Sequence, residues 1–377
     1  MMDKKKRVSY FDTARGIGMI LVLLGHLQND TVFSYSPHIL GLCAWIFSFH
    51  MPLFFIISGM LICFKEEEKG DIGTIVKKRF RQIMIPYFWF SFIYIFIVLY
   101  YLIIARVILL KTLLIQLWYV LGMYGMNVLW FLPALFAAEI MFVLITQRFK
   151  NQKSIIAVLV LLIGAIIINY ARKFLPNDSE LFERINEFIV TLIRPVFACS
   201  FILIGYLLFK GIKVLNEKTK RAWLVMLLSL PLLLFVNILI NIKNRPVDFR
   251  SLVFNNYPLY YICSTCGSLF IIILCMLLSK IRIGNKINGD NAFPVLKFYG
   301  VNSLVFMAVH NNSSIMTLAL KLAMYLNQYL TRARGYICYA LVILIFLIYI
   351  TLTIMVINRF FPFLAGKPYK PLRSDGK

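Results

Sequence analysis

The chain alternates between long apolar stretches and short polar segments from near its first residue almost to its last. A helix that crosses the hydrocarbon core of a bilayer needs about 20 predominantly apolar residues. Ten stretches of about this length lie at residues 11–32, 39–64, 82–105, 128–147, 154–171, 189–209, 222–242, 258–279, 298–320 and 336–358. The pattern therefore predicts an all-α polytopic membrane protein with about ten transmembrane helices.

One further apolar segment, between the third and fourth predicted spans, is less regular. Its sequence, KTLLIQLWYVLGMYGMN at residues 111–127, is interrupted by glycines and polar residues. Such a segment is more typical of a re-entrant or interfacial helix than of a full span. An eleventh span is the alternative.

The basic residues predict the orientation of the chain. The loops on the same side as both termini carry more than twice as many Lys and Arg as the opposite loops. Because basic loops stay in the cytoplasm, we expect both termini to be cytoplasmic. The net charge of +24 has the same explanation, because the basic residues form short clusters between apolar segments. We therefore do not expect nucleic-acid binding.

Composition adds to this picture. The chain is 61% hydrophobic and only 15% charged, which excludes an ordinary soluble domain. The polar stretches are too short to form a core of their own. We expect a single membrane domain over residues 1–377, with short tails at about 1–10 and 359–377. Cys263 and Cys266 form a CxxC motif within an apolar segment, without a second pair, so we expect no metal site.

Three histidines lie at nearly the same depth in the predicted membrane. With a rise of about 1.5 Å per residue, His26 lies roughly 22 Å, His50 roughly 21 Å and His310 roughly 18 Å from the cytoplasmic end of its span. A single buried histidine can simply form a hydrogen bond between helices. Three at one level favour proton transfer, because histidine accepts and returns a proton near neutral pH.

Charged and polar residues lie nearer the cytoplasmic side. Arg15 falls on the same helix face as His26, roughly 16 Å closer to the cytoplasm, and Asp12 is spaced to pair with it. Arg15 could alternatively be an interfacial anchor. Arg79 and Arg81, in the cytoplasmic segment KKRFRQ, could bind the phosphates of a cofactor, since a guanidinium suits phosphate.

Other polar residues in the predicted spans are few. Glu139, Asn302 and Ser303 lie below the level of the histidines. Intramembrane polar residues of this kind are candidates for substrate binding. They could equally serve a proton-coupled transporter or flippase of a glycan or lipid-linked sugar, or hold helices together in a sensor or scaffold.

The order of these motifs resembles a known family. The segments RGIGMILVLLGH, FSFHMPLFFIISGML, IPYFWF, LWFLPALF and GVNSLVFMAVH occur in this order between residues 15 and 310. They resemble the membrane acyltransferase-3 family, in particular the sugar O-acetylases related to fucose 4-O-acetylase.

This resemblance implies an activity and a location. Members transfer an acyl group, commonly acetyl, from cytosolic acyl-CoA to a cell-envelope or exopolysaccharide sugar in the bacterial cytoplasmic membrane. Arg15 and His26 would match the essential arginine and histidine, and Arg79 and Arg81 the second arginine motif. His26 would act as general base, with a transient acyl-histidine as the alternative. His50 and His310, together with Asn302, Ser303, Asp12 and Glu139, would be secondary or substrate-binding residues.

Overall fold

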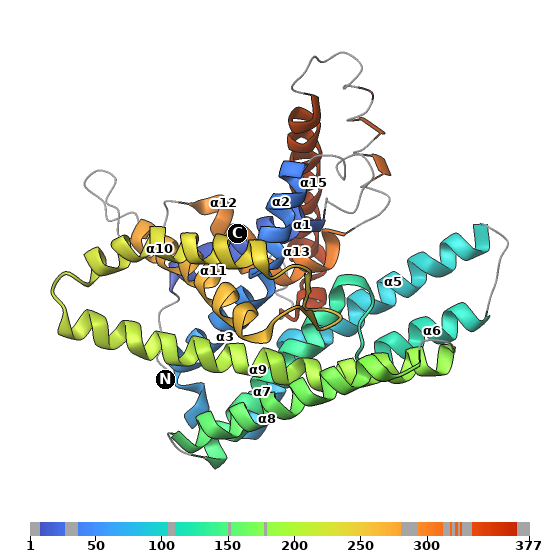
Figure 1. The fold of residues 1–377 in the computed structure, drawn as a ribbon. Helices are drawn as coiled ribbons and strands as arrows, with labels where there is room; N and C mark the ends of the chain where they lie inside the picture. The colour runs from blue at the N-terminus through green and yellow to red at the C-terminus, as the bar shows by residue number, and fades with distance from the viewer. Residues whose placement is uncertain are drawn as a thin grey trace, which may run out of the picture.

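The computed structural model describes residues 8–26, 37–104, 110–149, 152–176, 179–279, 293–311, 317–318, 321–322, 325 and 334–367. Long helices dominate this part of the chain (Figure 1). Eight helical segments are long and apolar enough to cross a membrane, and each overlaps one predicted span. They are Gly41–Lys65, Ile72–Ile104, Asn127–Arg148, Gln152–Phe174, Glu180–Lys218, Ala222–Lys243, Tyr257–Leu278 and Ala340–Phe360. The prediction of an all-α polytopic membrane protein is confirmed.

The helices have well-defined bounds. They are α1 Ser9–His26, α2 Pro37–Phe47, α3 His50–Lys65, α4 Ile72–Arg79, α5 Ile85–Ile104, α6 Leu110–Leu121, α7 Phe131–Arg148, α8 Gln152–Ala171, α9 Glu180–Lys218, α10 Ala222–Lys243, α11 Tyr257–Leu278, α12 Pro294–Val301, α13 Ser303–Val309 and α15 Arg334–Phe360. Shorter 3-10 helices lie at Glu67–Lys69, Asn127–Trp130, Arg172–Phe174 and Pro362–Ala365, and a π-helix lies at Phe80–Met84. Strands β1 (Val247–Asp248) and β2 (Val253–Phe254) form an antiparallel hairpin between α10 and α11.

Local sequence explains where several helices begin. Asp71 caps α4 by accepting a hydrogen bond from the backbone N–H of Thr74 at 2.8 Å. Asn256 caps α11 in the same way, from the N–H of Leu259 at 3.0 Å. Short polar side chains at this position satisfy N–H groups that have no partner within the helix.

The first and ninth predicted spans differ from the other eight. Helix α1 is described as far as His26, and the remainder of its predicted span, 27–32, lies outside the described residues. In the ninth predicted span, 298–320, helices α12 and α13 are separated at Asn302, and residues 312–316, 319 and 320 lie outside the described residues. The Asn302 amide donates to the carbonyl of Phe298, a local bond that competes with regular helix geometry.

Two glycine pairs bring the central helices into close contact. A Cβ atom on Gly16 of α1 would lie 1.9 Å from the Leu296 carbonyl oxygen of α12, and one on Gly300 would lie 1.7 Å from the Asp12 carbonyl oxygen. Gly59 of α3 and Gly205 of α9 approach backbone in the same way, at 2.0 and 2.1 Å. Larger residues would separate these helices, so the pairs fix α1 and α3 in place.

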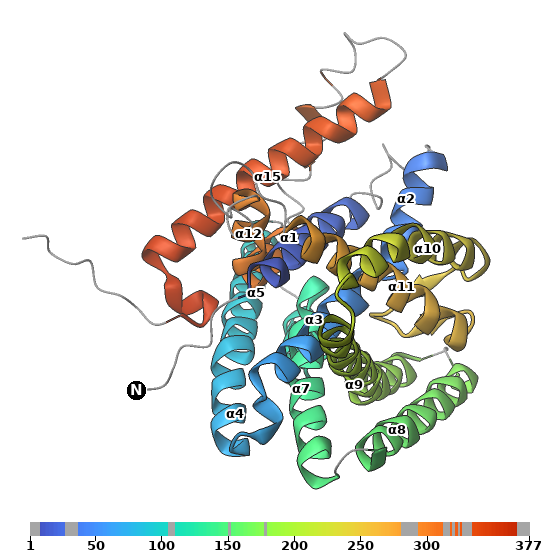
Figure 2. The ribbon, with the colours of Figure 1, turned by 90° about the vertical axis from the view of Figure 1, so that its left-hand side faces the viewer.

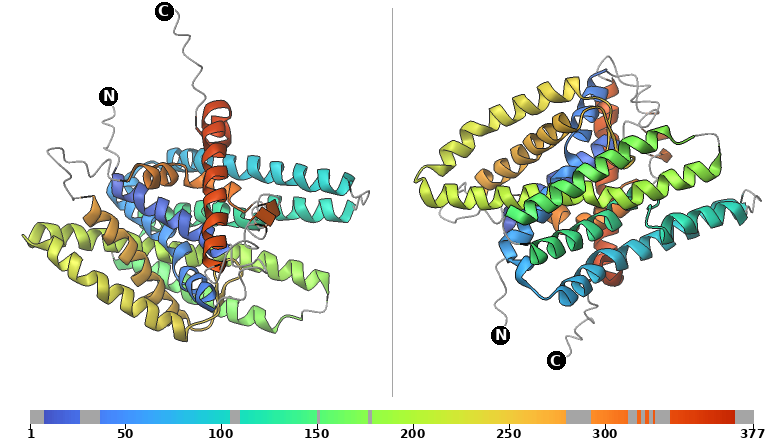
Figure 3. Two further views of the ribbon diagram at one scale, coloured as in Figure 1. Left: turned by 90° about the horizontal axis from the view of Figure 1, so that it is seen from above. Right: turned by 60° about the horizontal axis from the view of Figure 1, so that its bottom comes forward.

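The remaining helices surround this central group. Helix α9 packs along α3, α7 and α8, and α10 packs against α11. Figure 2 shows α1, α3 and α7 between α15 on one side and α8 on the other. Figure 3 shows α8 beside α9 and α10 beside α11. At 39 residues, α9 extends for about 58 Å, so its predicted span 189–209 is only its middle part.

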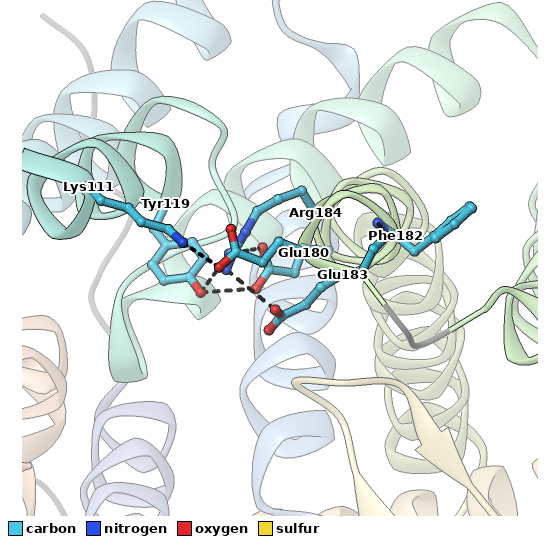
Figure 4. A network of polar contacts seen from close by, with 8 residues as sticks. Lys111, Tyr119, Glu180, Phe182, Glu183 and Arg184 are labelled. Carbon is cyan, nitrogen blue, oxygen red and sulfur yellow. Dashed lines mark hydrogen bonds and ion pairs between the residues drawn. The ribbon is translucent and has the colours of Figure 1, made fainter.

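Helix α6 contains 12 residues, too few to cross a membrane, as the irregular pattern predicted. Ion pairs connect it to the beginning of α9 (Figure 4). Lys111 lies 2.5 Å from Glu180, and the Tyr119 hydroxyl donates to Glu187 at 3.0 Å. Arg184 in turn contacts Glu187 at 2.5 Å.

Candidate active site

A cavity of about 270 Å³ lies between α1, α3, α7, α13 and the β1–β2 hairpin. Apolar side chains such as Met19, Phe54 and Leu132 form most of its wall. The polar lining residues are Arg15, His26, His50, Ser58, Arg79, Asn127, Glu139, Asp248, Arg250, Ser303 and His310. An apolar wall with a limited set of convergent polar groups is typical of ligand sites, and here the lining residues are up to about 300 positions apart in the sequence.

The three histidines meet in this cavity. The ring centroids of His26 and His310 are 5.0 Å apart. The Phe47 ring lies 6.2 Å from His26 and 5.1 Å from His50, each in an edge-on arrangement. The equal depths predicted from sequence thus correspond to one cluster of imidazoles.

Backbone carbonyls fix two of the three rings. His50 Nδ1 lies 2.9 Å from the carbonyl of Ile46, and His310 Nδ1 lies 2.7 Å from that of Met307. A carbonyl only accepts hydrogen bonds, so each Nδ1 carries the proton and each Nε2 is left as an acceptor. The Nε2 of His310 is buried and has no hydrogen-bond partner within the described chain.

The opposite part of the cavity contains a buried ionic cluster. Arg79 Nε lies 3.0 Å from a carboxylate oxygen of Glu139, and Arg79 Nη2 lies 2.5 Å from one of Glu67. The Ser58 hydroxyl donates to the other oxygen of Glu139. The π-helix begins directly after Arg79, a feature that often occurs at functional sites.

Cations outnumber carboxylates around this cluster. The cations are Arg15, Lys65, Lys78 and Arg79, and the carboxylates are Glu67 and Glu139. Outside the spans, burial raises the pKa of Glu67, but the charges of Arg79 and Lys78 outweigh it, so that the pKa lies below its ordinary value. A site of this composition suits a polyanion such as a phosphorylated ligand.

Seven of the predicted site residues line the cavity, namely Arg15, His26, His50, Arg79, Glu139, Ser303 and His310. The other three lie elsewhere. Asp12 is buried close to α12, and Arg81 is exposed. Asn302 accepts hydrogen bonds from Asn358 at 2.9 Å and Lys367 at 2.8 Å. The roles of these ten residues remain predictions.

Sequence reasoning missed Asn127, Asp248 and Arg250. Asn127 accepts a hydrogen bond from Asn311 at 2.8 Å, beside His310. Asp248 and Arg250 belong to a short loop with the sequence NRPVDFR, in which they could not be distinguished from other loop charges. The available signal was the alternation of charged residues with Val and Phe, which permits a hairpin with one face directed into the protein.

Two similarities to known proteins bear on the family of this chain. A sequence model of a family described as "Acyltransferase domain" matches residues 8–366. The nodulation protein NolL of Mesorhizobium japonicum is 38% identical over 78 residues. This stretch covers 19% of the present chain and 17% of that protein, so the chain spans a minor part of this relative.

Proposed function

The chain belongs to this acyltransferase family, and we propose that it is an O-acetyltransferase that moves an acetyl group from cytosolic acetyl-CoA to a hydroxyl of a cell-envelope or exopolysaccharide sugar. It is a multi-pass membrane protein, and we place it in a bacterial cytoplasmic membrane with both termini inside.

The donor would bind at the ionic end of the cavity. Arg15 and Arg79 line this end, and Lys65 and Lys78 lie near them. Their charges would hold the phosphates of acetyl-CoA, and the long, thin pantetheine arm would extend along α1 toward the histidines. Arg15 and His26 are 11 residues apart on α1, which corresponds to roughly 16 Å.

The histidine cluster would carry out the transfer. A ring nitrogen of His26 accepts the proton of the sugar hydroxyl as its oxygen attacks the thioester carbonyl. The bond from carbonyl carbon to sulfur then breaks, the ester remains on the sugar, and the proton on His26 passes to the CoA thiolate. Ser303 and the imidazoles of His50 and His310 would position the acceptor or polarise the carbonyl.

One observation supports this proposal most strongly. A single cavity contacts both the cationic cluster at one end of α1 and the imidazole cluster at the other. A thioester bound by its phosphates at the first cluster could therefore reach a proton acceptor at the second.

Acetyl transfer can be measured with purified protein in liposomes, radiolabelled acetyl-CoA and glycan extracted from host cells that lack the protein. The proposal expects label in the glycan fraction with stoichiometric release of free CoA. A transporter or flippase would move glycan across the bilayer without labelling it, and that result would contradict the proposal.

A further inference from the structure

The β1–β2 hairpin is held by side chains from helices that are distant in sequence. Three consecutive backbone carbonyls, from Arg250 to Leu252, each accept a hydrogen bond from a buried or half-buried side chain. Arg194 binds the carbonyl of Arg250 at 2.6 and 3.0 Å, Arg172 that of Ser251 at 2.5 Å, and Asn169 that of Leu252 at 2.9 Å.

The turn of the hairpin is correspondingly constrained. Leu252 has a φ of +54°, in a region that costs energy for a branched residue, and its side chain is fully buried. Phe249 is buried with its ring stacked on Trp130 at a centroid distance of 6.0 Å. A two-stranded hairpin with this many supports can hold its side chains in defined positions.

Two charged side chains of the hairpin, Asp248 and Arg250, are directed into the cavity. Asp248 and Arg250 flank Phe249, and all three line the cavity wall. One carboxylate oxygen of Asp248 accepts the backbone N–H of Arg250 at 2.9 Å, which fixes the carboxylate. Its second oxygen and the Arg250 guanidinium have no hydrogen bond or ion pair to the residues that the structure describes. The guanidinium lies 6.0 Å from the Tyr124 ring.

The hairpin lies near the histidine end of the cavity. Strand β1 packs against α2, which leads into His50. The last residue of α2, Phe47, contacts the rings of both His26 and His50, and these histidines line the same cavity as Asp248 and Arg250. The ionic cluster of Arg79 and Glu139 lies at the other end of the cavity, so the hairpin is placed where an acceptor, rather than the CoA phosphates, would bind.

We infer that Asp248 and Arg250 bind the acceptor and determine which of its hydroxyls meets His26. The inference rests on the proposed function and names the acceptor class as a sugar ring with at least two neighbouring hydroxyls. A fixed carboxylate accepts hydrogen bonds from adjacent hydroxyls, and a guanidinium donates to their oxygens. These are specificity-determining residues, since the proton acceptor is His26.

The test uses purified protein in liposomes with acetyl-CoA and two kinds of acceptor: glycan from host cells that lack the protein, and methyl glycosides of common hexoses with their monodeoxy analogues. Asp248→Asn keeps the oxygen that binds the Arg250 N–H, removes the charge and replaces the second oxygen with an NH2 group that only donates. We expect its KM for acceptor to rise by about tenfold or more, while its KM for acetyl-CoA changes less than about twofold. It should also lose discrimination against the monodeoxy analogue that the wild-type protein rejects.

Arg250→Lys provides a second variant, with the charge retained and the planar donor removed. It should raise the KM for acceptor in the same way. Arg245→Lys is the matched control, because Arg245 is an exposed residue on the same loop. The melting temperature of each variant shows that the fold is intact.

The possible results separate the two proposals. An unchanged acceptor KM and unchanged discrimination in folded Asp248→Asn and Arg250→Lys, with normal transfer by the wild-type protein, would overturn the inference alone. Absence of transfer by the wild-type protein to every acceptor would overturn the proposed function and the inference together.

Discussion

Two ionic networks in this protein have similar chemistry and very different surroundings. In the network between α6 and α9 (Figure 4), the side chains of Lys111 and Glu180 are 64% and 69% exposed. In the network beside the cavity, those of Arg79 and Glu139 are 13% and 3% exposed. Both contain ion pairs of 2.5 to 3.0 Å, so distance alone does not distinguish them.

The difference in burial decides what each network can do. Exposed pairs contribute little net stability, because solvent screens them and their side chains lose freedom. Buried charges are costly to desolvate, and a protein retains them where they are fully paired or where they act on a ligand. We therefore expect the network at Arg79 to matter for function, and the exposed Lys111–Glu180 pair to contribute little to stability or function.

Among the predictions about the two networks, the largest effect is expected for Glu139→Gln, as a loss of stability. This substitution leaves Arg79 as a buried cation with one fewer partner, a change that typically costs about 3 kcal/mol. The midpoint of unfolding in denaturant, measured in detergent, should fall accordingly. A variant as stable as the wild-type protein would show that Glu139 is not a required partner of Arg79.

Arg79→Lys and Arg81→Lys should distinguish the roles of two arginines that sequence analysis expected to bind the same phosphates. Only Arg79 lines the cavity, and lysine there keeps the charge but loses the planar fork. We expect the KM for acetyl-CoA to rise about tenfold for Arg79→Lys and less than about twofold for Arg81→Lys. Equal effects on KM would mean that the cavity is not the donor site.

The pH dependence of stability should show how much the ionised Glu67 side chain contributes to stability. Its folded-state pKa is lowered, so its contribution is present above its ordinary pKa of about 4.3 and is lost as the pH falls through the folded-state value. The melting temperature of Glu67→Gln should therefore lie below that of the wild-type protein at pH 7, and the gap should close under acidic conditions. Glu66→Gln, at a more exposed pair with Lys69, is the control. A gap independent of pH would contradict this account of Glu67.

The smallest effect is expected for Lys111→Gln, in the exposed network. Because both partners of the pair are largely in solvent, transfer activity and melting temperature should be indistinguishable from those of the wild-type protein. A substantial loss of transfer would show that the α6–α9 network takes part in function after all.

The sequence predicted much of the fold for a simple physical reason. Each span has to be apolar over its own length, so α7, α8 and α11 can be found without knowledge of their neighbours. The break at Asn302 could not be found in this way, because it depends on a side-chain bond to Phe298 and on the distant partners Asn358 and Lys367.

The candidate site was predicted only in part. His26, His50 and His310 stood out because ionisable groups are rare in apolar helices and their depths could be compared. Asp248 and Arg250 lie in a polar loop, where charge is expected, so only the folding of the hairpin against Trp130 places them in the cavity.

The most direct test of the central claim combines acetyl-CoA binding with acetyl transfer in His26→Ala and Arg15→Ala. The account predicts that folded His26→Ala binds acetyl-CoA like the wild-type protein and loses transfer by about 100-fold or more, at saturating donor and acceptor. Arg15→Ala should lose both binding and transfer. Transfer by His26→Ala at a rate near that of the wild-type protein would contradict the proposal that this imidazole accepts the proton.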